Sequence, residues 1–329
     1  MNWDIIQPYS LNKFSSFSAS LSDILAVKYG IKPLARLSCT SLNDFYAFKK
    51  HCEYEEMYIT HSKYKILFCD TVPECKKVII PFSSNREGVT YLYLSKSKKL
   101  SYRARDNDPE VFTLSNKLHV FNNHSFSKNR ELIRYKRLFE FATLLGYPKC
   151  CIEAFLNKGA KELLTIYSKE KKASFYLNNF FHSISNYYIS FHLPCSYKCK
   201  NSLDYNAKIY EILKQEVPSF SQALKSILRL PLLVCFLEKG RNCYFDYRVM
   251  VIFDGSINNN TMAYRQCFLT KTPYFDIKDD RFIKELMNFR LGNRVLMHEK
   301  KFNVYHNDTL LHSFKMSTMS RAWYLFNFT

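Results

Sequence analysis

Residues 146–155 read Gly-Tyr-Pro-Lys-Cys-Cys-Ile-Glu-Ala-Phe, and we expect this stretch to separate two helices in the middle of the chain. Apolar residues recur from Asn129 to Leu145 with a period of about 3.6, which predicts a helix there. Gly146 should end that helix, because glycine readily adopts the left-handed conformation that closes many helices. Pro148 suits the first turn of the helix that follows. The centre of the chain is therefore expected to be helical.

The segments on either side of this centre have different patterns. Residues 1–125 combine helical segments with short strand-like runs, whereas residues 231–329 are mostly strand-like. Residues 126–230 form the helical, cysteine-bearing region. We therefore expect an α+β fold with a mixed α/β N-terminal region, a helical centre and a β-rich C-terminal region. Strands are expected at 57–60, 65–69, 78–81, 90–94, 243–253, 262–269, 301–305 and 322–328, and a short helix at 279–289.

The chain is strongly basic. It has 48 Lys and Arg against 29 Asp and Glu, which gives a net charge of +19 over 329 residues. Such a surface favours an anionic partner, either nucleic acid or a phosphorylated small molecule. The run Lys128–Arg137 could contact phosphates, or it could be the solvated face of an amphipathic helix.

Several common enzyme classes are excluded by the glycine content. The chain has 7 glycines, and it contains neither Gly-x-Gly-x-x-Gly nor the phosphate-binding loop Gly-x₄-Gly-Lys-Ser/Thr. Gly-x-Ser-x-Gly, the turn that presents a nucleophilic serine, is missing as well. Dinucleotide-dependent oxidoreductases, phosphate-loop enzymes and serine hydrolases of that type are therefore not expected.

The N-terminus and the apolar segments indicate the cellular compartment in which we expect the protein. The N-terminus lacks the pattern of a signal peptide, and no apolar run is long enough for a transmembrane segment. We therefore expect a cytoplasmic protein. Thiols stay reduced in that compartment, so the 11 cysteines favour metal or redox chemistry over disulfides. The sequence does not indicate an oligomeric state.

A second cysteine stretch, residues 192–199, reads His-Leu-Pro-Cys-Ser-Tyr-Lys-Cys. In both stretches the cysteines follow a proline at an expected helix start, where free N–H groups and the helix dipole lower a thiol pKa. Cys195 and Cys199 would share one face of such a helix. Cys150 and Cys151 would diverge by about 100° on a regular helix.

Four interpretations of these cysteines remain open. An iron–sulfur cluster would use the four thiolates, and an adjacent pair ligates two irons more easily than it ligates one ion. A zinc or other single-ion site would use three or four of Cys150, Cys151, Cys195, Cys199 and His192. A redox or nucleophilic thiol pair is the third interpretation. The fourth is that the cysteines are small buried apolar residues.

The pairing of Gly-Tyr-Pro-x-Cys-Cys-x-x-x-Phe at 146–155 with His-x-Pro-Cys-Ser-x-x-Cys at 192–199 resembles the signature of a family of uncharacterised prokaryotic proteins, a domain of unknown function. The resemblance extends over about Leu138 to Gln266 and includes the Phe-Asp-Gly run at 253–255. It implies no activity. What it implies is that the four cysteines and His192 belong to one site.

These observations lead to two functional hypotheses. In the first, the chain binds an iron–sulfur cluster or another thiolate-ligated metal and is an enzyme of redox or modification chemistry. In the second, zinc has a structural role in a protein that binds nucleic acid without catalysis. Whether the protein is an enzyme stays open. In both hypotheses the metal ligands are Cys150, Cys151, Cys195 and Cys199, and His192 is a further ligand or an outer-sphere group.

Overall fold

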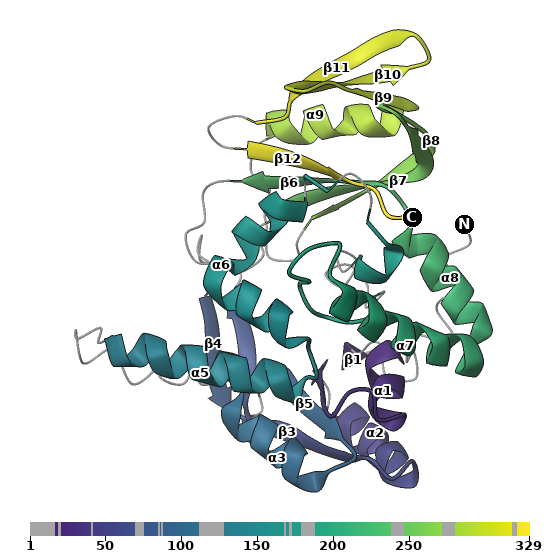
Figure 1. The fold of residues 1–329 in the computed structure, drawn as a ribbon. Coiled ribbons are helices and arrows are strands. Elements are labelled where there is room, and N and C mark those ends of the chain that lie inside the picture. The colour runs from purple at the N-terminus through teal and green to yellow at the C-terminus, as the bar shows by residue number, and fades with distance from the viewer. Residues whose placement is uncertain are drawn as a thin grey trace. The chain divides into compact units, whose positions relative to one another are not determined.

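A computed structural model describes residues 17–18, 21–40, 42–69, 76–84, 86, 88–111, 128–167, 169–170, 173–178, 188–237, 247–271, 280–317 and 321–329. The fold is α+β, with an α/β N-terminal region, a helical centre and a β-rich C-terminal region (Figure 1), as the sequence predicts. The chain divides into two compact units, one holding the N-terminal sheet and one holding the C-terminal sheet. The domain boundaries expected near residues 125 and 230 stay a prediction. Each described helix is too short or too polar to cross a membrane.

The N-terminal sheet has five antiparallel strands in the order β1-β2-β5-β3-β4. The four expected runs between residues 57 and 94 are strands, although the first two form one long strand, β3. β3 is continuous because its pairing with β5 shifts register between His61 and Lys65 instead of ending there. The strands are β1 (Phe17–Ser18), β2 (Ala35–Cys39), β3 (Tyr58–Cys69), β4 (Lys76–Pro81) and β5 (Val89–Ser95).

Helices cover both faces of this sheet. Alternate residues of a strand point to opposite faces, so Leu92 and Leu94 of β5 pack on one side and Tyr93 on the other. The first side is covered by α1 (Leu21–Lys28) and α2 (Leu42–Tyr54), and the second by α3 (Lys98–Asn107) and α5 (Lys128–Leu144). Because helices cover both faces, the side chains of Leu92, Tyr93 and Leu94 are all completely buried.

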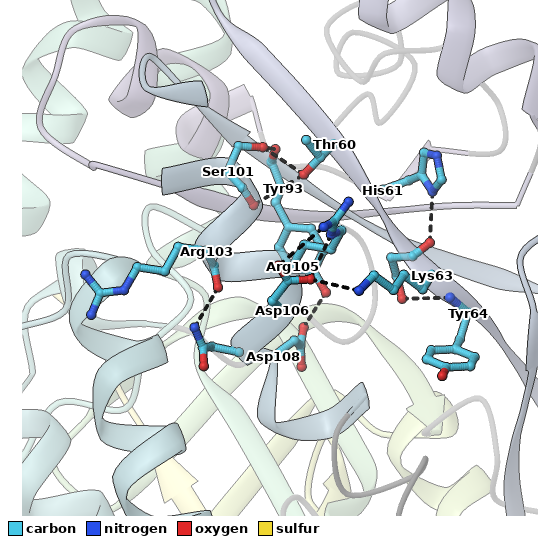
Figure 2. Close-up of polar contacts among 12 residues, drawn as sticks. Thr60, His61, Lys63, Tyr64, Tyr93, Ser101, Arg103, Arg105, Asp106 and Asp108 are labelled. Carbon is cyan, nitrogen blue, oxygen red and sulfur yellow. Dashed lines mark hydrogen bonds and ion pairs between the residues drawn. The ribbon is translucent and has the colours of Figure 1, made fainter. Parts of the chain in front are cut away.

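Polar contacts hold α3 against β3 (Figure 2). The hydroxyl oxygens of Thr60 and Ser101 lie 2.8 Å apart, and Ser101 also donates to the backbone oxygen of Tyr93 at 2.7 Å. At the shift in register, the exposed Lys63 reaches Asp106 at 3.3 Å. Ser101 is completely buried, so its contacts fix the position of α3, whereas the exposed Lys63 ion pair contributes little to stability.

Gly146 ends α5 as predicted. Its φ is +76°, its N–H donates to the Thr143 oxygen at 2.9 Å, and the Tyr147 N–H donates to the Ala142 oxygen at 3.2 Å. This pair of bonds is the Schellman closure of a helix. The next helix, α6 (Lys149–Tyr167), begins directly after Pro148, whose carbonyl accepts from Ile152 at 3.1 Å. Pro148 therefore occupies the position directly before the helix, and its carbonyl accepts the first helical hydrogen bond.

The amphipathic pattern predicted for α5 is only partly confirmed. Phe141, Leu144 and Leu145 are buried, whereas Leu132 and Ile133 are 54% and 45% exposed. Among the described side chains of the helix, those near its C-terminus pack on the sheet, because Phe141 and Leu144 belong to the same core cluster as Tyr93. The side chains of Lys128, Arg130 and Arg134, which make up most of the expected basic stripe, lie outside the described residues.

A helix beginning at Pro194 was expected, and this prediction is wrong. Residues 195–198 form a turn, and helix α7 (Lys200–Glu216) starts only after Cys199. The turn is stable because Glu170, which is distant in sequence, binds it: its carboxylate accepts from the Ser196 hydroxyl at 2.9 Å and from the Tyr197 N–H at 2.6 Å. The predicted helix end at Val217-Pro218 is confirmed, since α8 (Pro218–Leu228) begins there.

The C-terminal unit contains an antiparallel sheet of seven strands in the order β11-β10-β9-β8-β7-β6-β12. Helix α9 (Asp280–Leu291) lies against this sheet (Figure 1), and its Phe289 stacks on Phe314 and packs on Trp323. The predicted strands and helix are confirmed, except that residues 243–246 are outside the described residues. The strands are β6 (Leu232–Leu237), β7 (Tyr247–Asn258), β8 (Thr261–Lys271), β9 (Arg294–Met297), β10 (Lys301–His306), β11 (Thr309–Lys315) and β12 (Arg321–Phe326).

Candidate metal centre

Four cysteine thiols come together, two in the first turn of α6 and two in the turn that leads into α7. The sulfur atoms of Cys150, Cys151, Cys195 and Cys199 all lie within 4.8 Å of one another. Cys151 and Cys199 are buried, and Cys150 and Cys195 are half-buried. A group of this kind could hold a metal ion.

The adjacent cysteines do not diverge as a regular helix suggests. Cys150 and Cys151 lie in the first turn of α6, and their sulfur atoms are 3.8 Å apart. Each sulfur can turn about its Cα–Cβ bond, so neighbouring residues can point their thiols into the same space even though their Cβ atoms diverge. The first turn of a helix also presents free N–H groups and the positive end of the dipole, which favour thiolates.

Polar donors surround the two sulfurs of α6. The backbone N–H of Cys195 donates to the Cys151 sulfur at 3.2 Å, and the side-chain amide of Asn201 donates to the Cys150 sulfur at 3.5 Å. The hydroxyl of Ser202 lies 3.0 Å from the Cys151 sulfur. Metal-bound sulfur accepts hydrogen bonds, so these donors suit cysteines that act as metal ligands.

The His192 ring contacts the cysteine cluster indirectly, through the hydroxyl of Ser202. Its Nε2 is 2.9 Å from the Ser202 hydroxyl and its Nδ1 is 2.8 Å from the Ser190 hydroxyl. Its ring stacks on Tyr147 at a centroid distance of 5.2 Å. Burial, together with the positive charge of Lys32, lowers the pKa of His192 to about 3, so the imidazole is neutral. The group of close ligand atoms among the described residues does not include His192, and its role as a ligand stays a prediction.

The polar residues of α7 that connect these groups were not predicted from the sequence. Ser202 and Asn206 are buried on the same face of α7 as Ile209, Tyr210 and Leu213. Their spacing places two polar residues in an otherwise apolar helical stripe. Buried polar groups need partners, so this pattern was the signal that could have identified them.

A buried ion pair in the same unit was also not predicted from the sequence. Lys32 and Asp23 form an ion pair with almost no solvent exposure, and Tyr188 donates to the other carboxylate oxygen of Asp23 at 2.9 Å. The ammonium group of Lys32 lies 5.5 Å from the centre of the Tyr147 ring, which stacks on His192. Local sequence gives no signal for this pair, because a lysine and an aspartate of the N-terminal region look like ordinary surface residues.

An open cleft of about 700 Å³ lies beside the cysteines. Asn201, the residue that donates to the Cys150 sulfur, is part of its wall. Lys149 and Lys208 bring positive charge to the cleft, and Asp204 brings a negative charge. The remaining lining residues are Gly30, Ile31, Gly146, Pro148 and Tyr205.

The fold and the cysteine geometry define a protein with a thiol cluster built from the first turn of α6 and the turn that leads into α7. Residues 123–227 match the model of a family described as "Protein of unknown function (DUF483)". The match spans the four cysteines and His192, and it ends before residues 228–266, to which the sequence resemblance extended. No curated protein and no solved structure gives a significant match to the chain.

Proposed function

We propose that this protein binds one metal ion through Cys150, Cys151, Cys195 and Cys199, and that zinc is the ion. The observation that carries the proposal is the spread of the sulfur atoms, all within 4.8 Å of one another. Zinc–thiolate bonds of about 2.3 Å in a tetrahedron place the sulfurs about 3.8 Å apart. The Cys150–Cys151 sulfur distance of 3.8 Å matches this value.

The same distances favour a single ion over an iron–sulfur cluster. In a cluster the four thiolates are divided between different irons, and bridging sulfides lie between those irons, so sulfurs on different irons must be farther apart than sulfurs around one ion. The adjacent cysteines, which suggested a cluster when considered as a sequence, are close enough to share one ion. A single iron bound by the four thiolates would fit the same space.

A structural role agrees best with the ligand set. Four thiolates complete the coordination of zinc and leave no position for a reacting water or substrate. Zinc with four thiolates carries two negative charges, and the donors from Cys195 and Asn201 partly offset them. The metal would join the first turn of α6 to the turn that precedes α7. Metal binding would then add to the stability of the folded chain, because the unfolded chain has no preformed site.

The partner proposed for this structural zinc protein is anionic. The support is the net charge of +19 and the two lysines, Lys149 and Lys208, that line the cleft beside the cysteines. Nucleic acid is the first choice, since contacts with phosphates provide most of the affinity of basic proteins for it. A phosphorylated small molecule in the cleft is the second.

An enzyme of redox or modification chemistry is the competing proposal. The observation that favours it is the half-exposure of Cys150 and Cys195, since a reactive thiolate or a redox-active iron needs access from solvent. Asn201 connects Cys150 to the open cleft, which would provide that access.

Metal analysis of protein purified without oxygen separates these proposals. About one zinc per chain and no colour supports the structural zinc site, whereas a coloured protein that contains iron supports redox chemistry. Replacing Cys151 or Cys199 with serine should remove the metal. Cys267→Ser is the matched control, because Cys267 lies in β8 and burial raises its thiol pKa to about 11. Full metal retention in both site variants would refute the shared site.

The anionic partner needs its own experiment. Binding to generic single-stranded and double-stranded nucleic acid should weaken steeply as salt increases. Lys149→Ala and Lys208→Ala should each reduce binding, whereas Lys315→Ala, at an exposed position of β11, should not. Absence of binding at low salt would contradict the nucleic-acid proposal, and inorganic phosphate or a nucleotide would then be tested in the cleft.

A further inference from the structure

The exposed face of α3 carries basic side chains that no described residue neutralises. Between residues 96 and 106 the chain has five basic residues and one acidic residue. Four of the basic residues are exposed, and none of the four forms an ion pair with another described residue: Lys96, Lys98, Lys99 and Arg103. Figure 2 shows the guanidinium group of Arg103 directed away from the other labelled side chains. This face of the N-terminal unit is therefore a concentrated positive surface.

The exposed side chains of α3 form a stripe along the helix. Tyr102 follows Lys98 by four residues, and Arg103 follows Lys99 by four, so the members of each pair lie one turn apart on the same side. The opposite side of α3 is held on the sheet, since Ala104 is completely buried. The helix therefore cannot turn its charges inward, and the stripe follows a helix about 15 Å long.

This placement of charge weakens the helix. Lys98 and Lys99 lie in the first turn, where positive charge opposes the helix dipole, and Lys99 repels Arg103 one turn later. Lys149 of α6 is different, because Glu153 lies one turn after it and pairs with it at 3.7 Å. A local arrangement that costs stability without an internal gain is typical of a functional surface.

Two exposed tyrosines accompany the positive charges. Tyr102 is 39% exposed, and the Arg105 guanidinium lies 4.7 Å from the centre of its ring, a contact that holds the ring in place. Tyr58 is 48% exposed and shares a face of β3 with Thr60, whose hydroxyl oxygen lies 2.8 Å from that of Ser101 on α3. Both tyrosines therefore lie on the side of the sheet that α3 covers.

We propose that the exposed face of α3, together with Tyr58, binds single-stranded nucleic acid. This inference rests on the proposed nucleic-acid partner, and it names a surface for that partner outside the cleft beside the cysteines. The basic side chains fit the phosphates. The exposed tyrosine rings fit bases, which stack on aromatic side chains when they are not stacked in a duplex. A double helix would use the cations and leave the tyrosines without a base.

The number of exposed cations determines the expected salt dependence. For a single strand, the logarithm of the binding constant falls with the logarithm of the salt concentration, with a slope of about −0.7 for each neutralised phosphate. The four exposed cations of this surface predict a slope of about −3. Arg105 is not counted, because its guanidinium binds the carboxylate of Asp106 at 3.0 Å.

The experiment is a titration of the full-length protein against a labelled oligo-uridine of about 20 nucleotides, which is longer than most single-strand sites. Binding is followed by fluorescence anisotropy at several salt concentrations. The double variant Lys99→Gln with Arg103→Gln should change the slope to about −1.5 and weaken binding about 25-fold at about 0.1 M salt. An unchanged slope and affinity in this variant would overturn the inference.

Substitutions at Tyr102 test the stacking. Tyr102→Ala should weaken binding at least about fivefold, whereas Tyr102→Phe, which keeps the ring, should bind as wild type. The matched controls are Lys50→Gln and Tyr54→Ala, because both positions are exposed on α2, which covers the other face of the same sheet. Both controls should bind as wild type, and circular dichroism checks that every variant is folded. Equal affinity of Tyr102→Ala and wild type would remove the stacking from the inference and so contradict it.

The outcomes separate this surface from the proposed partner. If Lys149→Ala and Lys208→Ala weaken binding while the α3 variants do not, the nucleic-acid partner stands and the surface on α3 fails. If no nucleic acid binds at low salt, both fail. Tighter binding to a duplex of the same length, or to vesicles of anionic lipid, would also overturn the inference, since neither ligand offers bases to the tyrosines.

Discussion

Replacing Gly146 with alanine should destabilise the N-terminal unit more than the same change at Gly30. Both glycines end a helix with positive φ, +76° and +74°, and both are followed by Schellman bonds. Alanine in the left-handed conformation costs about 1–2 kcal/mol at either position. A Cβ at Gly146 would lie 2.9 Å from Cδ of Pro33, whereas a Cβ at Gly30 would meet nothing within 4 Å.

The contact with Pro33 provides the expected difference. Pro33 is a rigid ring in a short connection, so relieving the overlap needs a backbone shift, and forced overpacking typically costs about 1–3 kcal/mol. Gly30→Ala should therefore lose about 1–2 kcal/mol and Gly146→Ala about 2–5 kcal/mol. The displacement at Gly146 also reaches Pro148 and the cysteines of α6, so zinc should bind more weakly to this variant.

Hydrogen exchange of β5 amides is the suitable measurement, because that strand lies inside the N-terminal sheet and reports unfolding of this unit by itself. The metal-free, reduced protein is used, so that binding does not contribute to the free energy. Equal losses for Gly30→Ala and Gly146→Ala would refute the argument from the Pro33 contact.

Other predictions concern the buried charges. Lys32→Met leaves the Asp23 carboxylate buried without its cation and should cost about 3–5 kcal/mol by the same exchange measurement. Adding Asp23→Asn should recover much of that loss, and a double variant as unstable as Lys32→Met would contradict the reasoning. The pKa of His192 is about 3 in the folded protein, below its unfolded value of about 6.5, so only the unfolded state gains a proton between these pH values. Stability of the metal-free protein should therefore fall by about 2 kcal/mol from pH 7 to pH 5, as measured by urea unfolding followed by circular dichroism, and His192→Gln should have a smaller dependence.

Local signals were sufficient for most of the secondary structure. Gly146, Pro148 and Val217-Pro218 act through the conformation of their own backbone, so their effect on helix ends is independent of the rest of the fold. Strand runs such as Thr90–Leu94 were recognisable because branched and aromatic residues dominate them. The same local reasoning failed at residues 195–198, where the carboxylate of Glu170 binds the turn.

The candidate site also combines features that local sequence predicts with features that depend on distant contacts. The sequence by itself indicated which cysteines belong together, because the stretches 146–155 and 192–199 resemble one family signature, and Pro148 placed the first pair at the start of a helix. Only the tertiary structure decided that their sulfurs lie within 4.8 Å of one another, and that Ser202 connects Cys151 to His192. A proline restricts only its own neighbours in the chain, whereas distances between residues 50 positions apart depend on how the helices pack. That packing is a sum of many weak contacts from the whole unit, and no short motif contains it.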